Sequence, residues 1–245
     1  MTPRQSNTYV LVHGAWHGGW CWTRVAERLR QAGHTVRAPT LPGLAERQRE
    51  LSAAITLDDF IQSIADALQQ QDLQDVILVG HSFGGLVISG VADRLRTRIR
   101  QLVLLDAFLL RNGQSTLDTL PPALVAKLEH KAADTGGIPP LPADGFGLND
   151  PADIAFVQAQ LTPQPIGTYR STFTLRHPLG NGLPVSYIRC TSPAFAGVAD
   201  CQQWAHAQYA QKWQWIDLVA GHDAMISAPD ALTQLLLTIP DQARP

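Results

Sequence analysis

One serine in this chain stands in a setting that could make it a nucleophile. Ser82 lies in the segment Gly80-His81-Ser82-Phe83-Gly84, directly after the apolar run 76–79 and before a helical pattern that starts near Leu86. A serine between a strand and a helix sits on a sharp turn, which needs glycines two residues before and after it because a side chain there would collide with its neighbours. The spacing predicts a nucleophile elbow, and an ordinary structural turn is the alternative.

A serine hydroxyl becomes a good nucleophile only when a base takes its proton. His222 is the candidate base, because it follows the expected strand 213–219, and the carboxyl ends of parallel strands meet at one edge of the sheet. The histidine in turn needs a carboxylate that orients it and stabilises the imidazolium. Asp106 ends the apolar strand 99–105 and is favoured, since burying a charge without a partner is costly. Asp200, the first acid after the expected strand 185–190, is the alternative.

The negative oxygen of a tetrahedral intermediate is stabilised by preorganised backbone N–H groups. Phe83, directly after the nucleophile, is expected to supply one of them. Ala15, in the glycine-rich loop that follows the short strand 9–12, is expected to supply the other. The residues expected to line a substrate pocket are Trp16, Phe108, Phe146 and Tyr169.

Apolar strands alternate with helical patterns of about a dozen residues, which is typical of an α/β fold with a mainly parallel sheet covered by helices on both faces. The pattern changes over residues 111–183, where nine of the seventeen prolines fall. We interpret this segment as a cap inserted into a single domain of residues 1–245, because regular strands and helices return after it. Within it, helices are expected at 123–131 and 152–161.

Composition narrows the range of partners. Apolar residues make up 45% of the chain and charged ones 16%, and the net charge of −2 gives no electrostatic reason to expect nucleic acid or an anionic membrane. Three cysteines without a paired spacing suit a reducing compartment, and the polar residues 1–8 carry no apolar core of a signal peptide. We therefore expect a cytoplasmic protein. No metal cluster, phosphate loop or dinucleotide motif is visible, so no cofactor is expected.

With these motifs in place, the chain resembles the α/β-hydrolase superfamily. The segments 13–20 and 80–85 are similar to those of the plant methylesterase and hydroxynitrile lyase branch and its bacterial esterase relatives. That branch usually carries its acid shortly after the strand that ends here at Cys190, where this chain has Ser192-Pro193; the acid role therefore passes to Asp106. Gly14 and Asp223 replace the threonine and lysine of the lyases, which disfavours cyanohydrin cleavage.

These residues together predict a serine hydrolase that cleaves a small carboxylic ester through an acyl-enzyme on Ser82. Hydrolysis of a lactone, an amide or a carbon–carbon bond by the same residues is an alternative. A ligand receptor that keeps the fold and hydrolyses weakly is another, because a fold does not by itself determine a function. The expected partner is a small-molecule ester, and the sequence leaves a homodimer open.

Overall fold

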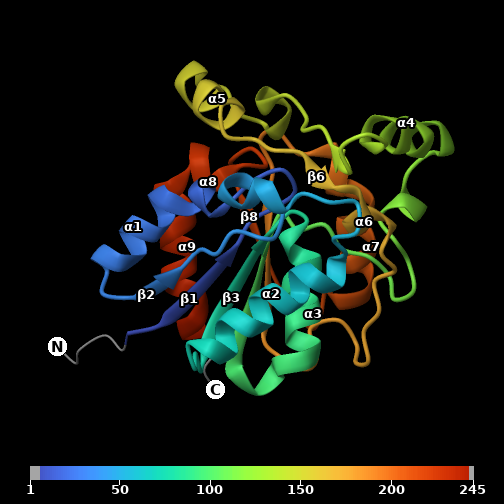
Figure 1. The fold of residues 1–245 in the computed structure, drawn as a ribbon. Coiled ribbons are helices and arrows are strands. Elements are labelled where there is room, and N and C mark those ends of the chain that lie inside the picture. Colours follow the sequence, from blue (N-terminus) through green and yellow to red (C-terminus); the bar gives the residue numbers. More distant parts are fainter. Residues whose placement is uncertain (1–5, 243–245) are drawn as a thin grey trace.

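The computed structural model describes residues 6–242, and its centre is a six-stranded sheet in which every neighbouring pair of strands is parallel (Figure 1). This confirms the α/β class predicted from the alternation of strands and helices. In spatial order the strands are β2 (Thr35–Arg37), β1 (Thr8–Val12), β3 (Val76–His81), β4 (Ile99–Leu105), β7 (Val185–Cys190) and β8 (Gln214–Leu218).

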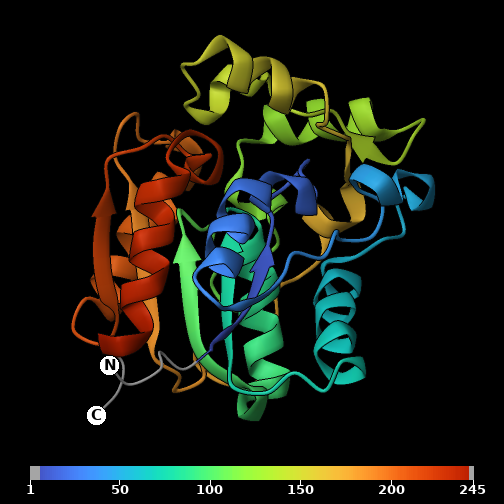
Figure 2. The ribbon, with the colours of Figure 1, turned by 90° about the vertical axis from the view of Figure 1, so that its left-hand side faces the viewer.

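Both faces of the sheet are buried. Successive strand residues point to opposite faces, so each strand contributes apolar side chains to both. In β1, Val10 and Val12 belong to one apolar cluster, whereas Tyr9 and Leu11 belong to the other. The first cluster packs against α2 (Leu57–Gln70), α3 (Gly84–Leu95) and α7 (Ala199–Tyr209). The second packs against α1 (Thr23–Gln31), the short α8 (Ala224–Ser227) and α9 (Pro229–Gln242), which cover the face turned to the viewer in Figure 2.

Local signals in the sequence explain where the helices begin and end. Thr56 and Asp59 form a capping box at the start of α2, since each side chain accepts a hydrogen bond from the other residue's backbone N–H. Gly33, at a φ of +90°, follows the end of α1. The polar start of the chain was expected to lack a signal-peptide core, but residues 1–5 lie outside the described residues. Within residues 6–242, no helix has the length and apolar character that crossing a bilayer requires.

The helical part of the segment between β4 and β7 lies above the carboxyl edge of the sheet, and its last residues run down to the start of β7 (Figures 1 and 2). It contains α4 (Pro122–Ala132) and α5 (Pro151–Gln158), close to the two helices predicted there. It also contains a small antiparallel pair, β5 (Gly137–Ile138) and β6 (Gln164–Pro165), followed by α6 (Ile166–Arg170). The interpretation of residues 111–183 as a cap within one domain stays a prediction. In the described part of the chain, the 3-10 helices are Gly19–Trp22, Ala45–Glu50, Arg96–Arg98, Leu117–Thr119, Ala143–Phe146 and Ala196–Val198.

Candidate active site

Ser82 sits on the turn between β3 and α3, at the carboxyl edge of the sheet. Its φ is +50°, in the left-handed region that residues other than glycine rarely occupy, and such strained residues cluster at functional sites. The turn is tight because α3 begins against the end of β1: a Cβ on Gly84 would lie 2.7 Å from the carbonyl oxygen of His13. The backbone thus presents the Ser82 side chain at the edge of the sheet.

Asp106 and His222, from the ends of two different strands, lie together. Asp106 directly follows β4, and its Oδ2 is 2.6 Å from Nδ1 of His222. The other oxygen, Oδ1, accepts hydrogen bonds from the Cys190 N–H (3.1 Å) and from Nε2 of Gln202 on α7 (2.7 Å). Both members of the pair are buried. The alternative acid, Asp200, is exposed on α7 and lines a separate hollow.

Aromatic rings enclose the imidazole of His222. The ring of Phe195 stacks on it with centroids 4.1 Å apart, and Phe146 lies 6.3 Å away at a similar tilt. His81 approaches with centroids at 4.5 Å, and its Nε2 donates to the carbonyl oxygen of His222 at 3.1 Å. These contacts hold the ring in a largely water-free position.

A cavity of 420 Å³ opens beside Ser82 under the segment between β4 and β7. Ala15, Ser82 and Phe83, which the sequence suggested as nucleophile and N–H donors, all line this cavity. Trp16, Phe108 and Tyr169 line it too, but Phe146 does not: it is buried between Trp16, His17 and Phe195, behind the cavity wall. The structure therefore corrects the expected pocket role of Phe146.

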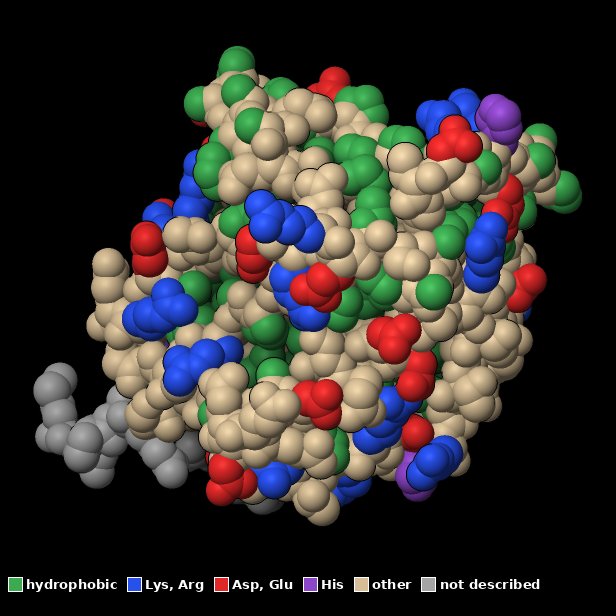
Figure 3. Space-filling model, in the orientation of Figure 1, with side chains coloured by type: hydrophobic (Ala, Val, Ile, Leu, Met, Phe, Trp, Pro, Cys, Tyr) green, Lys and Arg blue, Asp and Glu red, His purple; other side chains and the backbone are tan. Residues whose placement is uncertain are grey.

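The cavity wall is mainly apolar. On the face drawn in Figure 3, hydrophobic side chains gather in the upper part, between the segments that carry α5 and α4. The lining also includes Lys127 and Lys131, two exposed side chains on α4. Its apolar members besides those already named are Leu120, Leu124, Leu128, Ile138, Pro139, Pro140, Leu141, Pro142, Phe195 and Val198.

The loop after β1 packs directly against the nucleophile. A Cβ on Gly14 would lie 2.8 Å from Cβ of Ser82, so only glycine allows this approach. Trp16, at a φ of +65°, anchors the loop to the segment above, because its Nε1 donates to the carbonyl oxygen of Ile138 at 3.1 Å. The loop is thereby held between Ser82 on one side and β5 on the other.

The ring of His13 holds the same loop from below. Its Nε2 accepts the N–H of Leu41 (3.1 Å), so its Nδ1 carries the proton and donates to the carbonyl oxygen of Gly14 (2.8 Å). Burial lowers the pKa of His13 to about 3, so the ring is neutral. The N–H of Ala15 belongs to the same peptide as that carbonyl group and points the opposite way, because the peptide is planar and trans.

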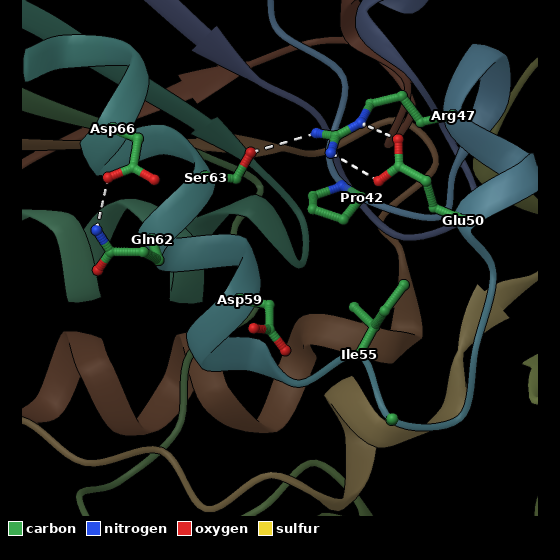
Figure 4. A pocket seen from close by; sticks show the side chains of 9 residues that line it. Pro42, Arg47, Glu50, Ile55, Asp59, Gln62, Ser63 and Asp66 are labelled. Carbon is green, nitrogen blue, oxygen red and sulfur yellow. Dashed lines mark hydrogen bonds and ion pairs between the residues drawn. The ribbon is translucent and has the colours of Figure 1, made fainter. Parts of the chain in front are cut away.

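A second hollow lies on another part of the surface, between the 3-10 helix Ala45–Glu50 and α2 (Figure 4). Its polar side chains are already engaged with one another. Arg47 pairs with Glu50 and donates to the Ser63 hydroxyl, and Gln62 donates to Asp66. Asp59 serves the capping box of α2. Local structural contacts therefore account for the polar side chains that line this hollow.

Three features of the site have no counterpart among the residues predicted from sequence. Gln202 binds the acid, Phe195 stacks on the histidine, and Asp223, directly after His222, pairs with His17. The partner of Asp223 lies 206 positions away in the chain and leaves no local signal in the sequence. Across residues 6–242, no group of three or more His, Cys, Asp or Glu side chains is arranged to hold a metal ion.

Comparison with known sequences finds relatives along nearly the whole chain. The profile of the Alpha/beta hydrolase family matches residues 9–235. A protein named carbendazim hydrolyzing esterase, from Nocardioides sp. (strain SG-4G), is 36% identical over 252 residues, covering 94% of this chain and 98% of the relative. Methylesterase 10 of Arabidopsis thaliana is 25% identical over 259 residues, covering 98% and 94% of the two chains.

A solved structure shows the same architecture. An extracellular alpha/beta-hydrolase from a Paenibacillus species superimposes with a TM-score of 0.81 at 27% sequence identity, covering 95% of this chain and 98% of that one. The fold and the sequence therefore point to the same group of proteins.

Proposed function

This chain belongs to the alpha/beta hydrolase family, and from that premise we propose that it is a serine hydrolase cleaving a small carboxylic ester through an acyl-enzyme on Ser82. Relatives of this chain are named esterases and methylesterases. The observation that carries the proposal is the buried pair of Asp106 and His222, 2.6 Å apart, at the sheet edge that also presents Ser82 to the cavity.

In the proposed reaction Oγ of Ser82 attacks the carbonyl carbon of the ester, and its proton passes to Nε2 of His222. Asp106 holds Nδ1, which leaves Nε2 as the proton acceptor and stabilises the imidazolium that forms. The carbon–oxygen bond to the alcohol then breaks, and the alcohol leaves with the proton from His222. Water, activated by the same nitrogen, attacks the acyl group, so the acid is released and Ser82 regains its proton.

The backbone N–H groups of Ala15 and Phe83 would stabilise the negative oxygen of both tetrahedral intermediates. Both residues line the cavity with Ser82, and Phe83 stands at the amino end of α3, where the helix dipole also favours a negative charge.

The cavity supports a substrate with an apolar body. Its volume of 420 Å³ is in the range that takes a small molecule, and its aromatic and aliphatic wall has few groups that could bind polar substituents. We propose that residues 111–183 act as a cap that shapes this cavity, with Trp16, Phe108 and Tyr169 contacting the acyl or alcohol group.

A fluorophosphonate probe tests the nucleophile, because it reacts covalently only with an activated serine. We expect rapid labelling of one serine per chain, identified as Ser82 by peptide mass spectrometry and absent in Ser82→Ala. Ser82→Ala should also lower kcat on a p-nitrophenyl ester by about 10⁶-fold. Folded protein that does not react with the probe would contradict the proposal and favour a ligand receptor.

Matched substrates test the bond that is cleaved. We expect kcat/KM to be highest for an ester and lower for the lactone and the amide of the same acyl group. A higher value for the lactone or the amide would keep Ser82 as nucleophile but overturn the ester assignment.

A further inference from the structure

A second histidine–carboxylate pair lies beneath the site and has no part in the proton transfers just described. Nε2 of His17 is 3.0 Å from Oδ2 of Asp223, and Nδ1 of His17 is 2.8 Å from the carbonyl oxygen of Ala15. His17 is 1% exposed and Asp223 is fully buried. Since Asp223 directly follows His222, one imidazole connects the loop of the proposed N–H donor to the loop of the proposed base.

The contacts of His17 determine its protonation. The carbonyl oxygen of Ala15 only accepts a hydrogen bond, so Nδ1 of His17 carries a proton, and the carboxyl group at Nε2 favours a second proton there, which makes the ring an imidazolium. Burial alone would lower the pKa of His17, but the charge and hydrogen bond of Asp223 outweigh it and raise that pKa.

A second histidine also approaches the pair, since Nε2 of His81 lies 3.7 Å from Oδ1 of Asp223. Burial lowers the pKa of His13, at the end of β1, and of His81, on β3, so both rings are neutral. Burial likewise raises the pKa of the Cys21 thiol, which stays protonated. From the cap, the apolar ring of Phe146 packs on His17. The imidazole of His222, which pairs with Asp106, lies 4.5 Å from His81 between ring centroids.

His17 and His13 hold the two peptides on either side of Ala15. His13 binds the carbonyl oxygen of Gly14, and His17 binds that of Ala15. With both carbonyl groups held, the backbone of Ala15 has little rotational freedom, and its N–H keeps one direction.

We propose that His17 and Asp223 form a positioning pair, which holds the Ala15 N–H at a constant distance from His222. The inference rests on the proposed function, because it assumes that Ala15 binds the oxyanion. It assigns Asp223 to the orientation of the loops, whereas Asp106 serves the proton transfer.

The test compares an ester with its thionoester, in which sulfur replaces the carbonyl oxygen and accepts hydrogen bonds more weakly. In the wild type, the ratio of kcat for ester to thionoester reports how well the N–H donors are placed. Asp223→Asn removes the charge that keeps His17 protonated. We expect kcat for the ester to fall about tenfold, which is less than the ~100-fold loss on removing a whole donor. KM should stay within about twofold of the wild type, and the ester-to-thionoester ratio of kcat should be reduced.

The matched control is Asp106→Asn, which should slow both substrates by the same factor and leave the ratio unchanged. The double variant His17→Gln/Asp223→Asn should be no slower than Asp223→Asn alone, because the two side chains act as a unit. An unchanged ester-to-thionoester ratio in folded Asp223→Asn would overturn the proposal and leave a purely structural pair.

A measurement on the wild type keeps the inference testable if the variants do not fold. NMR of ¹⁵N-labelled histidine side chains should show His17 as an imidazolium above the pH at which a free histidine loses its proton, and a neutral His17 under those conditions would overturn the proposal. Activity that survives in Ser82→Ala would instead contradict the proposed function, so the two failures are distinguishable.

Discussion

At the scale of single residues, the contacts of Asp106 support its proposed role as the acid that orients His222. One oxygen meets His222, and the other is saturated by a backbone N–H and by Gln202. A carboxylate held on both oxygens has one orientation, which is what a group that orients an imidazole requires. Asp200, on the same helix as Gln202, is exposed to solvent.

This contrast predicts the effect of removing each charge. Asp106→Asn should lower kcat by about 10⁴-fold, because an amide favours the wrong tautomer of His222. Asp200→Asn should stay within about twofold of the wild type. Steady-state kinetics on one ester, with thermal melting to verify folding, measures both. A large loss in Asp200→Asn with an active Asp106→Asn would reverse the assignment.

The sequence could single out the proposed nucleophile, base and acid because each lies at the end of a recognisable strand. It could not predict the groups that hold them. Gln202 lies 96 positions from Asp106, and Asp223 lies 206 positions from His17. Such pairs depend on how helices and loops pack in three dimensions, which no local spacing encodes. The placement of Phe146 behind the cavity wall was missed for the same reason.

At the scale of elements, the elbow depends on the contact between α3 and β1. Gly84, the first residue of α3, approaches the carbonyl oxygens of Val12 and His13, and a Cβ there would lie 2.8 and 2.7 Å from them. Backbone atoms cannot rotate away as a flexible side chain can, so a larger residue must separate the helix from the strand.

Gly84→Ala should therefore destabilise the protein by about 1–3 kcal/mol, as overpacking of a core does. Urea unfolding followed by circular dichroism measures this. Gly145→Ala is the matched control, because a Cβ at Gly145 meets nothing within 4 Å and its φ is not in the left-handed region, so its stability should be unchanged. Equal stability of the two variants would mean that α3 tolerates a shift away from β1.

The sequence predicted the longer strands and helices best. The expected strands 99–105 and 185–190 agree with the structure, because a long apolar run is a local signal. The two-residue strands β5 and β6 and the five-residue α6 were not predicted. Elements this short have no periodicity, and contacts distant in sequence, such as the hydrogen bond from Trp16 to Ile138, help to hold them.

At the scale of the whole molecule, buried neutral histidines couple stability to pH. Burial lowers the pKa of His13 from 6.5 to about 3, and burial together with the nearby His222 lowers that of His81. Below about pH 6.5 the unfolded chain binds protons at these rings and the folded chain does not, so acid favours unfolding. His17 acts in the opposite sense: its raised pKa contributes stability that is fully present below pH 6.5 and is lost as the pH rises through its folded value.

The free energy of unfolding should therefore fall as the pH decreases from about 6.5 to 5, by up to ~1.4 kcal/mol per pH unit for each of the two neutral rings. Carboxyl groups contribute little in this window, because their unfolded pKa values lie near 4. His13→Gln should be less stable at neutral pH, since it loses the bond to Gly14, but its stability should depend less steeply on pH. Urea unfolding of both proteins at several pH values measures the two slopes. An identical slope in His13→Gln would show that His13 takes up a proton in the folded state, against its neutral bond to Leu41.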